Sequence, residues 1–328
     1  MYTTGIEFMT NRANPGIDPF SIWGWLLALY LFLGGMVAGL MIVASVQENK
    51  FAEKWEHRLS RIVPLAAIVL LSLGMFALYL DLEIQGLKLD VIRLYMTFKP
   101  TSPISWGAWI LLIAYASLAL WFLASLTAEE VNRFTEKFRF LRFLIPLRRW
   151  ANGIKEKILL ANTIVGVALG IYTGVFLSSM ASRPIWHSGI LGPLFLVSGV
   201  SAGAATLSSF KVNHDLSKAF LRWDILALIT ELILLAIFLL DNITGEEFHK
   251  AAAMLFLAGP LTGAFFGVVV LSGILAPLVL EWADLTEKGK APLMAVALVL
   301  IGSFALRCII ICAGQACHCI FSGQHFIH

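Results

Sequence analysis

Polar side chains with proton chemistry stand at the ends of several long apolar runs in this sequence. Tyr79 and Asp81 close one run, Tyr172 lies near the end of another, and the stretch after it carries Trp186 and His187. A lipid-soluble quinone needs an apolar slot for its ring and a hydrogen-bond donor or proton acceptor near each carbonyl oxygen. These side chains could supply both, although an aromatic belt at the membrane surface explains the same residue types.

Two charged residues lie far inside apolar runs. Glu231 is eight residues beyond Trp223, and Arg307 is about fifteen residues into the last run, which also contains Gln315. A charge at such depth is costly in hydrocarbon and by default marks function. Two interpretations stay open: the charges pair and lock helices together, or Glu231, Arg307 and Gln315 line a path for protons.

The histidines and cysteines are poorly placed for a haem or metal centre. All seven histidines fall in loops, at the ends of apolar runs or in the tail, so no pair is available for a b-type haem within the bilayer. The four cysteines crowd the C-terminus, where Cys312 and Cys317-His318 loosely resemble a c-type haem attachment with a widened gap. Small apolar cysteines that pack within a helix explain them more simply. We expect no haem, iron–sulfur cluster or metal in this chain.

The composition is that of a membrane protein. The 328 residues are 59% hydrophobic and only 14% charged, whereas soluble domains are about 45–50% apolar. A bilayer core of about 30 Å needs roughly 20 apolar residues per helix. Eight runs are of that kind, covering residues 21–46, 62–80, 104–126, 158–180, 189–209, 223–240, 255–280 and 292–320. The sequence therefore predicts an all-α membrane protein with eight transmembrane helices.

Lysine and arginine are unevenly divided between the two sets of loops. The first, third, fifth and seventh loops hold 17 of these residues, whereas the other loops and both tails together hold 6. Because cytoplasmic loops carry the excess of positive charge, the odd loops are predicted to be cytoplasmic and both termini periplasmic or exterior. The net charge is only +3, without a basic arm or stripe, and gives no support to nucleic-acid binding.

Three segments outside the runs also carry information. Phe134–Trp150 and Leu87–Phe98 mix apolar with charged residues and are predicted to be helices that lie in the plane of the interface. Residues 1–20 have no continuous apolar stretch and no small-residue cleavage site. We therefore expect them to remain as an N-terminal periplasmic segment.

A short internal similarity indicates a duplication. Gly35–Gly39 (GMVAG) resembles Gly199–Gly203 (GVSAG), and both predicted helices run from the outside to the inside. Two four-helix bundles in parallel orientation, residues 21–180 and 181–328, would follow. Small residues spaced by four are also a general device of helix packing in membranes, so the repeat stays a hypothesis.

Taken together, these features resemble the NrfD-like family, the membrane subunits of polysulfide reductase and related respiratory complexes. The residues that carry the resemblance are Trp23–Gly39, Asp81, Pro103–Gly107, Tyr172–Gly174 with Pro184 and Trp186, and Arg307 with Ala313–Gln315. The resemblance covers nearly the whole sequence, and the motifs lie on successive runs.

The resemblance implies a subunit of the bacterial or archaeal cytoplasmic membrane that is built of two four-helix bundles and has no redox centre of its own. Menaquinone or ubiquinone would bind near the outer face, with Tyr172 as the leading contact and Asp81 as a proton acceptor. The other expected contacts are Trp23, Tyr30, Tyr79, Thr173, Trp186 and His187.

The resemblance also implies partners on the periplasmic side. A ferredoxin-like iron–sulfur subunit would dock on a rim formed by Arg183, His187 and residues 85–99. It would pass electrons between the quinone and a catalytic subunit, which in such complexes is a molybdopterin enzyme or a multihaem cytochrome.

Two other classes of function fit part of the pattern. A secondary transporter is compatible with the possible repeat and the buried charges, but the prolines mostly lie near the ends of runs, where they do not break helices at mid-membrane. A purely structural anchor for peripheral subunits requires only the apolar helices.

Overall fold

The computed structural model is almost entirely helical. It describes residues 7–9, 24–84, 99, 102–137, 142–179, 183, 185–245, 247–287, 293–316 and 318–320. Within these residues, eight helices are long and apolar enough to cross a membrane. The predicted number of spans is therefore confirmed.

Most of the helices that form these spans follow the apolar runs to within a few residues, but the helix over His214–Thr244 begins nine residues before its predicted run (223–240) and ends four residues after it. The helices of the spans are α1 (Trp25–Lys50), α2 (Leu59–Ile84), α4 (Pro103–Ser125), α7 (Lys155–Ser178), α8 (Leu191–Ser208), α9 (His214–Thr244), η2 with α11 (Ala264–Leu275 and Ala276–Glu287) and α12 (Leu293–Ala316). Shorter helices in the described residues are α5 (Ala128–Lys137), α6 (Leu144–Gly153) and α10 (Glu247–Leu257). Two short strands, β1 (Glu7–Met9) and β2 (His318–Ile320), pair antiparallel.

The seventh run departs from its predicted bounds. A single helix over 255–280 is predicted, but α10 ends at Leu257 and the span begins only at Ala264. Gly259 and Pro260 lie in the break. Proline has no backbone N–H to donate and its ring collides with the preceding turn, so the helix cannot continue through this point.

The first twelve residues of the seventh span, η2, form a π-helix. Within it, the Ser272 hydroxyl donates a hydrogen bond to the Gly267 carbonyl, five residues earlier, at 2.9 Å.

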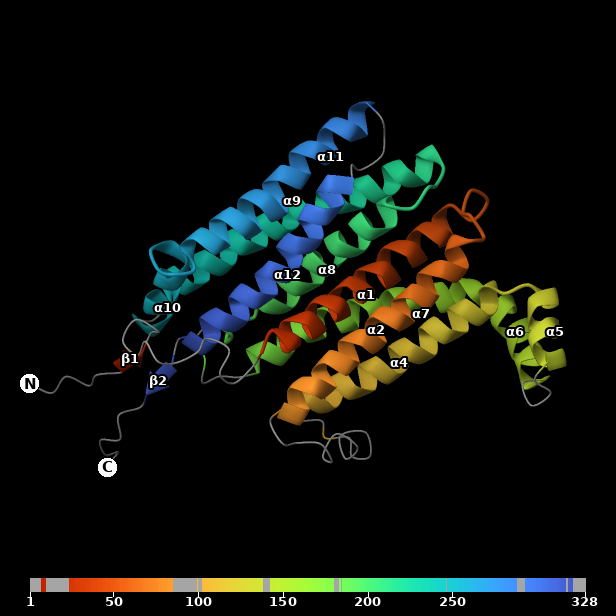
Figure 1. Cartoon of the computed structure of the whole chain (residues 1–328), viewed down its shortest axis with the longest axis horizontal. Helices are drawn as coiled ribbons and strands as arrows, with labels where there is room; N and C mark the ends of the chain where they lie inside the picture. Colours follow the sequence, from red (N-terminus) through yellow and green to blue (C-terminus); the bar gives the residue numbers. More distant parts are fainter. Residues whose placement is uncertain are drawn as a thin grey trace, which may run out of the picture.

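The spans fall into two groups, which meet where α8 packs against α1 and α7. In the first group, α1 contacts α2 and α7, and α4 contacts the same two helices. In the second group, α8 contacts α9 and α12, and the η2–α11 span contacts both. Helices α1 and α8 pack against each other through the middle of the molecule (Figure 1).

Glycines allow the contact between α1 and α8. A Cβ on Gly199 would stand 3.1 Å from the Cα of Gly35, and a Cβ on Gly203 would stand 2.8 Å from the Cα of Gly39. The two motifs that suggest a duplication in the sequence therefore face each other, backbone to backbone. Close approach of this kind is the usual role of small residues spaced by four in membrane helices.

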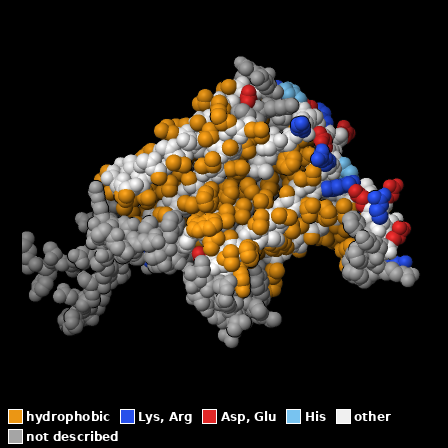
Figure 2. All heavy atoms as spheres, viewed as in Figure 1, with side chains coloured by type: hydrophobic (Ala, Val, Ile, Leu, Met, Phe, Trp, Pro, Cys, Tyr) orange, Lys and Arg blue, Asp and Glu red, His pale blue; other side chains and the backbone are white. Residues whose placement is uncertain are grey.

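Apolar side chains cover the outer surface of the spans. On α2, for example, Leu65, Val69, Leu73 and Phe76 are exposed at helical spacing. Figure 2 shows such side chains over most of the visible helical surface, whereas most of the charged and histidine side chains that it colours lie toward one end of the molecule. That arrangement fits a hydrocarbon environment around the spans and water at the end that carries the charges.

The two ends of the molecule differ. We call the end that carries α5 and α6 the basic end, and the opposite end, where β1 pairs with β2, the terminal end (Figure 1). An even number of spans returns the polypeptide to the side on which it starts, and the strand pair brings segments near both termini together there.

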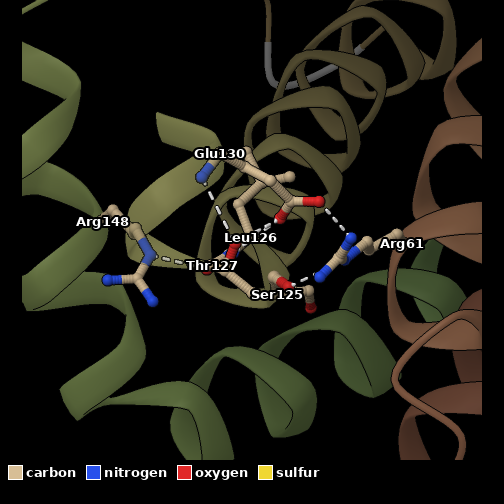
Figure 3. Close-up of polar contacts among 6 residues, drawn as sticks. All are labelled: Arg61, Ser125, Leu126, Thr127, Glu130 and Arg148. Atoms are coloured by element: carbon tan, nitrogen blue, oxygen red, sulfur yellow. Dashed lines mark hydrogen bonds and ion pairs between the residues drawn. The ribbon is translucent and has the colours of Figure 1, made fainter. Parts of the chain in front are cut away.

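The amphipathic segment at the basic end forms two short helices, α5 and α6, in the region predicted as one interfacial helix over Phe134–Trp150; residues 138–141 lie outside the described residues. The predicted helix over Leu87–Phe98 lies outside them entirely. A capping box starts α5: the Thr127 N–H donates to Glu130 Oε2 at 2.8 Å, and the Glu130 N–H donates to Thr127 Oγ1 at 3.3 Å. Arg61 of α2 pairs with Glu130, and Arg148 of α6 donates to the Leu126 carbonyl at 2.6 Å (Figure 3). These contacts tie both short helices to the first group of spans.

Candidate functional site

Asp81 lies at the terminal end, where α2 meets the beginning of α1. It is the last residue of its span, and its side chain is buried. Its Oδ1 accepts a hydrogen bond from the backbone N–H of Gly24, the residue that caps α1, at 3.3 Å. A carboxylate at a helix N-terminus is favoured by the helix dipole. Asp81 therefore fixes the start of α1 and brings a carboxyl group to this end of the first group.

Tyr30 lies about one and a half turns further into α1 and is buried against α2. A Cβ on Gly74 of α2 would stand 3.7 Å from Cδ2 of the Tyr30 ring, so the glycine leaves room for this phenol. Tyr30 belongs to the same buried apolar cluster as Tyr172 and Phe176 of α7. Met75, Leu78 and Ile110 pack against this cluster.

Tyr172 crosses from α7 to α4. Its phenol occupies the space beside Gly107 so closely that a Cβ at that position would overlap the phenol ring and its oxygen. The side chain is only 6% exposed, and its ring lies 6.2 Å from that of Phe176 at an interplanar angle of 47°. In the sequence, Gly107 stands out only as part of a family motif; its steric role is visible only in the structure.

Thr173 follows Tyr172 on α7, and its hydroxyl bonds within that helix. Its hydroxyl donates to the Gly170 carbonyl at 2.7 Å, and its methyl group faces Gly34 of α1, where a Cβ would stand 3.7 Å away. Tyr79 is 43% exposed on α2. Trp23, the first expected contact, lies outside the described residues.

Trp186 and Arg183 close the end of α12. The Trp186 indole N–H donates to the Ile310 carbonyl at 2.8 Å, and its ring lies where a side chain on Gly314 would stand. Arg183 donates to the Gly314 and Gln315 carbonyls at 3.2 and 3.1 Å, which suits a cation at a helix C-terminus. His187 is exposed beside them. Trp186 and Arg183 thus belong to the second group of spans, on the same end as Asp81.

Arg307 lies at the meeting point of the two groups. Its guanidinium is fully buried and donates to Leu31 O of α1 at 3.1 Å, to Phe195 O of α8 at 3.2 Å and to Ser303 O of its own helix at 2.7 Å. The same group lies over the Phe195 ring, 5.1 Å from its centroid. Glu231 of α9 interacts electrostatically with it. The charges of Glu231 and Arg307 therefore act on each other. Gln315 lies two turns beyond Arg307 and is buried near the end of α12.

Glu48 of α1 is another buried acid; it lies near the basic end and is not among the site residues predicted from the sequence. It accepts from the Ser60 hydroxyl at 2.7 Å and from the Trp121 indole at 2.9 Å, and it pairs with Lys155 at 2.5 Å. A cavity of about 560 Å³ opens beside it and is also lined by His57. Burial, together with the charges of Arg61 and Lys155, lowers the pKa of His57. Glu48 is thus fully paired and stabilises this end of the first group.

The terminal end of the first group has the chemistry that a quinone requires. Tyr172 and Tyr30 bring phenol groups into an apolar cluster, and Asp81 brings a carboxyl group to the same end. Tail residue Cys317 and the side chains of His318 and Cys319 lie outside the described part of the molecule, within which no three His, Cys, Asp or Glu side chains come together as a metal site.

The sequence is also similar to those of known proteins. The family model described as "Polysulphide reductase, NrfD" matches residues 10–318. The sequence is 28% identical to Protein NrfD of Escherichia coli strain K12 over 316 residues, which cover 90% of this sequence and 95% of that protein. It is 27% identical to the C subunit of polysulfide reductase from Wolinella succinogenes over 308 residues, 90% of this sequence and 94% of that protein.

A more distant similarity reaches an archaeal protein. Over 288 residues, 84% of this sequence and 64% of the relative, the identity is 25% to the Hdr-like menaquinol oxidoreductase integral membrane subunit of Archaeoglobus fulgidus.

Proposed function

The chain belongs to the NrfD family of polysulfide reductase membrane subunits, and on this premise we propose that it is the quinone-reactive subunit of a respiratory oxidoreductase complex. It is a multi-pass integral membrane protein of the bacterial inner membrane. The observation that carries the proposal is the position of the Tyr172 phenol against Gly107, inside an apolar cluster at the end of the molecule that also holds Asp81.

The proposed quinone site lies at the terminal end of the first group of spans. When bound, a quinone or quinol supplies a carrier for two electrons and two protons. Tyr172 donates a hydrogen bond toward a carbonyl oxygen and orients the ring, while Tyr30 and Phe176 provide apolar surface. Asp81 takes up or returns a proton at Oδ2, because the Gly24 N–H already occupies Oδ1.

The other expected contacts would have different roles at the quinone site. Tyr79 is exposed on α2 and could meet the quinone tail at the lipid surface. Thr173 and Trp186 donate hydrogen bonds to helix carbonyls, so they would support the site through packing. Trp23 and His187 remain proposed contacts of the quinone.

We place the terminal end on the periplasmic side, since the lysine and arginine residues concentrate in the loops of the opposite end. A ferredoxin-like iron–sulfur subunit would dock there against Arg183, His187 and residues 85–99. A catalytic subunit, either a molybdopterin enzyme or a multihaem cytochrome, would complete the electron path. The membrane subunit would contribute no haem or iron–sulfur cluster of its own.

The two groups of spans support a division of the chain into two bundles with different roles. Residues 1–20 would be a periplasmic segment, residues 21–180 the four-helix bundle that binds the quinone, and residues 181–328 a second bundle. The contact of the Gly35 and Gly199 motifs is compatible with two bundles of related origin.

Titration of the purified complex with a menaquinone analogue tests the site. Tyr172→Phe and Asp81→Asn are each expected to weaken analogue binding about tenfold or more, which corresponds to about 1.4 kcal/mol. Asparagine keeps an oxygen for the Gly24 N–H, so Asp81→Asn removes the proton acceptor and retains the cap. The matched controls are Tyr115→Phe, whose hydroxyl meets Ser72 at 3.1 Å on another part of α4, and Asp241→Asn, which is exposed on α9.

Three outcomes would contradict the proposal. Unchanged analogue binding and full quinol activity in both variants would remove this site. An intact complex that binds no analogue at all would be a structural anchor. Substrate uptake by vesicles that contain this protein alone would instead support a secondary transporter.

A further inference from the structure

A pair of buried acids lies in the second group of spans, away from the proposed quinone site. Asp224 of α9 is 1% exposed and Glu281 of α11 is 0% exposed. Both lie toward the basic end, Asp224 ten residues into α9 and Glu281 six residues before α11 ends. Helices α9 and α11 pack against each other, and the side chains of Asp224 and Glu281 interact across this contact.

Among the described residues, only one group donates a hydrogen bond to the pair. Ser201 of α8 donates to Asp224 Oδ1 at 2.6 Å. Neither oxygen of Glu281 nor Oδ2 of Asp224 receives a hydrogen bond from any group in the described residues. Two carboxylates cannot bond to each other, because both only accept; a proton on one of them creates the missing donor. The orphaned oxygens therefore point to a ligand that the protein groups do not supply.

No cation of the described residues faces the pair. The charges that act on it are themselves acidic: Glu231 on Asp224, and Asp284 on Glu281. Helices α8 and η2 contain no charged residue. Arg307 of α12 acts on Glu231, two turns further along α9, and Arg222 is exposed to the outside. Two bare carboxylates in such surroundings would carry the full cost of burial and repulsion.

We propose that Asp224 and Glu281 form a proton-binding site, in which one proton is shared between the two carboxyl groups. A proton fits this site better than a metal cation does. Hard cations such as Ca²⁺ collect about six to eight oxygen ligands, whereas the pair offers four carboxyl oxygens and one of these is taken by Ser201. The backbone carbonyls of regular helices are already occupied by their own hydrogen bonds.

Asp284 is the next acid toward the basic end, and its charge acts on Glu281. It lies one turn beyond Glu281 on α11 and is half-buried near the basic end. On the other side, Glu231 lies on the same face of α9 as Asp224, since seven residues make about two turns. Acidic groups thus extend from the basic end, through the pair, to Glu231 beside Arg307.

Infrared difference spectroscopy of the purified protein tests the proposal without any quinone. The wild type is expected to show the C=O stretch of a protonated carboxyl group, at a frequency that shifts on deuterium exchange. This band is expected to be lost in both Glu281→Gln and Asp224→Asn. Asp241→Asn on the same helix as Asp224 serves as the matched control and keeps the band. Glutamine at position 281 can donate an amide hydrogen to Asp224, so the variant is expected to unfold at a temperature no lower than the wild type.

The remaining outcomes overturn the proposal. A band that persists in both variants assigns the proton to another residue. A wild-type band that disappears at constant pH when sodium or lithium replaces choline shows a cation site. If Asp224→Asn fails to fold, two measurements still test the proposal: the effect of sodium on the wild-type band, and the presence of the band in Glu281→Gln. Either result alone can contradict a shared proton.

Discussion

The Tyr172 phenol of α7 lies against the backbone of Gly107 on α4, in the space that a side chain at position 107 would take. The contact joins two helices of the first group and sets the position of the phenol group. A glycine at position 107 is therefore required by the tyrosine.

Gly107→Ala is expected to displace the phenol while leaving its chemistry intact. Binding of a menaquinone analogue should weaken about tenfold, or about 1.4 kcal/mol, and the effect should not add to that of Tyr172→Phe. The measurement is the same titration of the purified complex. Gly267→Ala is the control, because a Cβ there meets nothing within 4 Å. Equal binding in Gly107→Ala and Gly267→Ala would separate the glycine from the site.

Arg307 is expected to hold the two groups of spans together. Arg307→Met removes its bonds to Leu31 O and Phe195 O and leaves Glu231 without a counter-charge. Removal of one partner from a buried charge pair costs about 3–5 kcal/mol. Thermal unfolding in detergent should show this loss, and Glu231→Gln added to Arg307→Met should recover part of it. If the double variant is no more stable than Arg307→Met, the two charges are not coupled.

Glu231→Gln separates a proton path from a structural lock. If the path is real, proton uptake by vesicles that contain the complex should fall several-fold while binding of the quinone analogue stays normal. If Glu231 only balances Arg307, uptake is unchanged at intact activity and the residue leaves the path. Asp241→Asn, exposed on the same helix, controls for the loss of an acid from α9.

Gly199→Ala is expected to force α1 and α8 apart, because the new Cβ would stand 3.1 Å from the Cα of Gly35. The space is bounded by backbone, which cannot move aside as a flexible side chain can. Overpacking of this kind costs about 1–3 kcal/mol. The melting temperature in detergent measures it against Gly267→Ala. A Gly199→Ala protein as stable as that control would mean that the two helices are not in close contact.

The capping box of α5 predicts a local effect of pH. The Thr127 N–H bond, followed by the Thr127 hydroxyl and the charge of Arg61, lowers the pKa of Glu130. A lowered pKa in the folded state means that the contribution of Glu130 is complete above its ordinary pKa of about 4.3 and is lost as pH falls through the folded value. Hydrogen exchange of the α5 amides, corrected for intrinsic rates, should rise in acid.

Thr127→Ala is expected to raise the same exchange at neutral pH, since loss of such a cap costs about 1 kcal/mol. Thr163→Ala is the control, because that hydroxyl only donates back to Leu159 O of its own helix. Equal protection of α5 in the two variants would contradict a role for the cap.

Much of the fold could be read from the order of the residues. A hydrocarbon layer accepts only helices that satisfy their own backbone, so runs of about 20 apolar residues define the spans and their number. Helix ends were less predictable: the seventh span starts late because Gly259 and Pro260 break the helix, and a break inside an apolar run leaves no mark on hydropathy. The resemblance carried by Trp23–Gly39, Pro103–Gly107 and Tyr172–Gly174 is confirmed at the level of the family.

The candidate quinone site could be predicted only in part from the sequence. Residue types placed Asp81 and Tyr172 at the ends of spans, but single residues in a sequence do not reveal which helices touch. The structure decided that Trp186 faces α12, that Gly107 makes room for Tyr172 and that Arg307 reaches α1 and α8.

Composition and the order of apolar residues are enough to predict the membrane environment, the eight helices and the family, because these depend on local sequence. Which polar groups meet depends instead on how the helices pack. Asp224 and Glu281 are 57 residues apart on different helices, and nothing local distinguishes them from other acids near span ends. Their pairing follows from how α8, α9 and α11 pack, since a buried carboxyl group takes its chemistry from the groups around it.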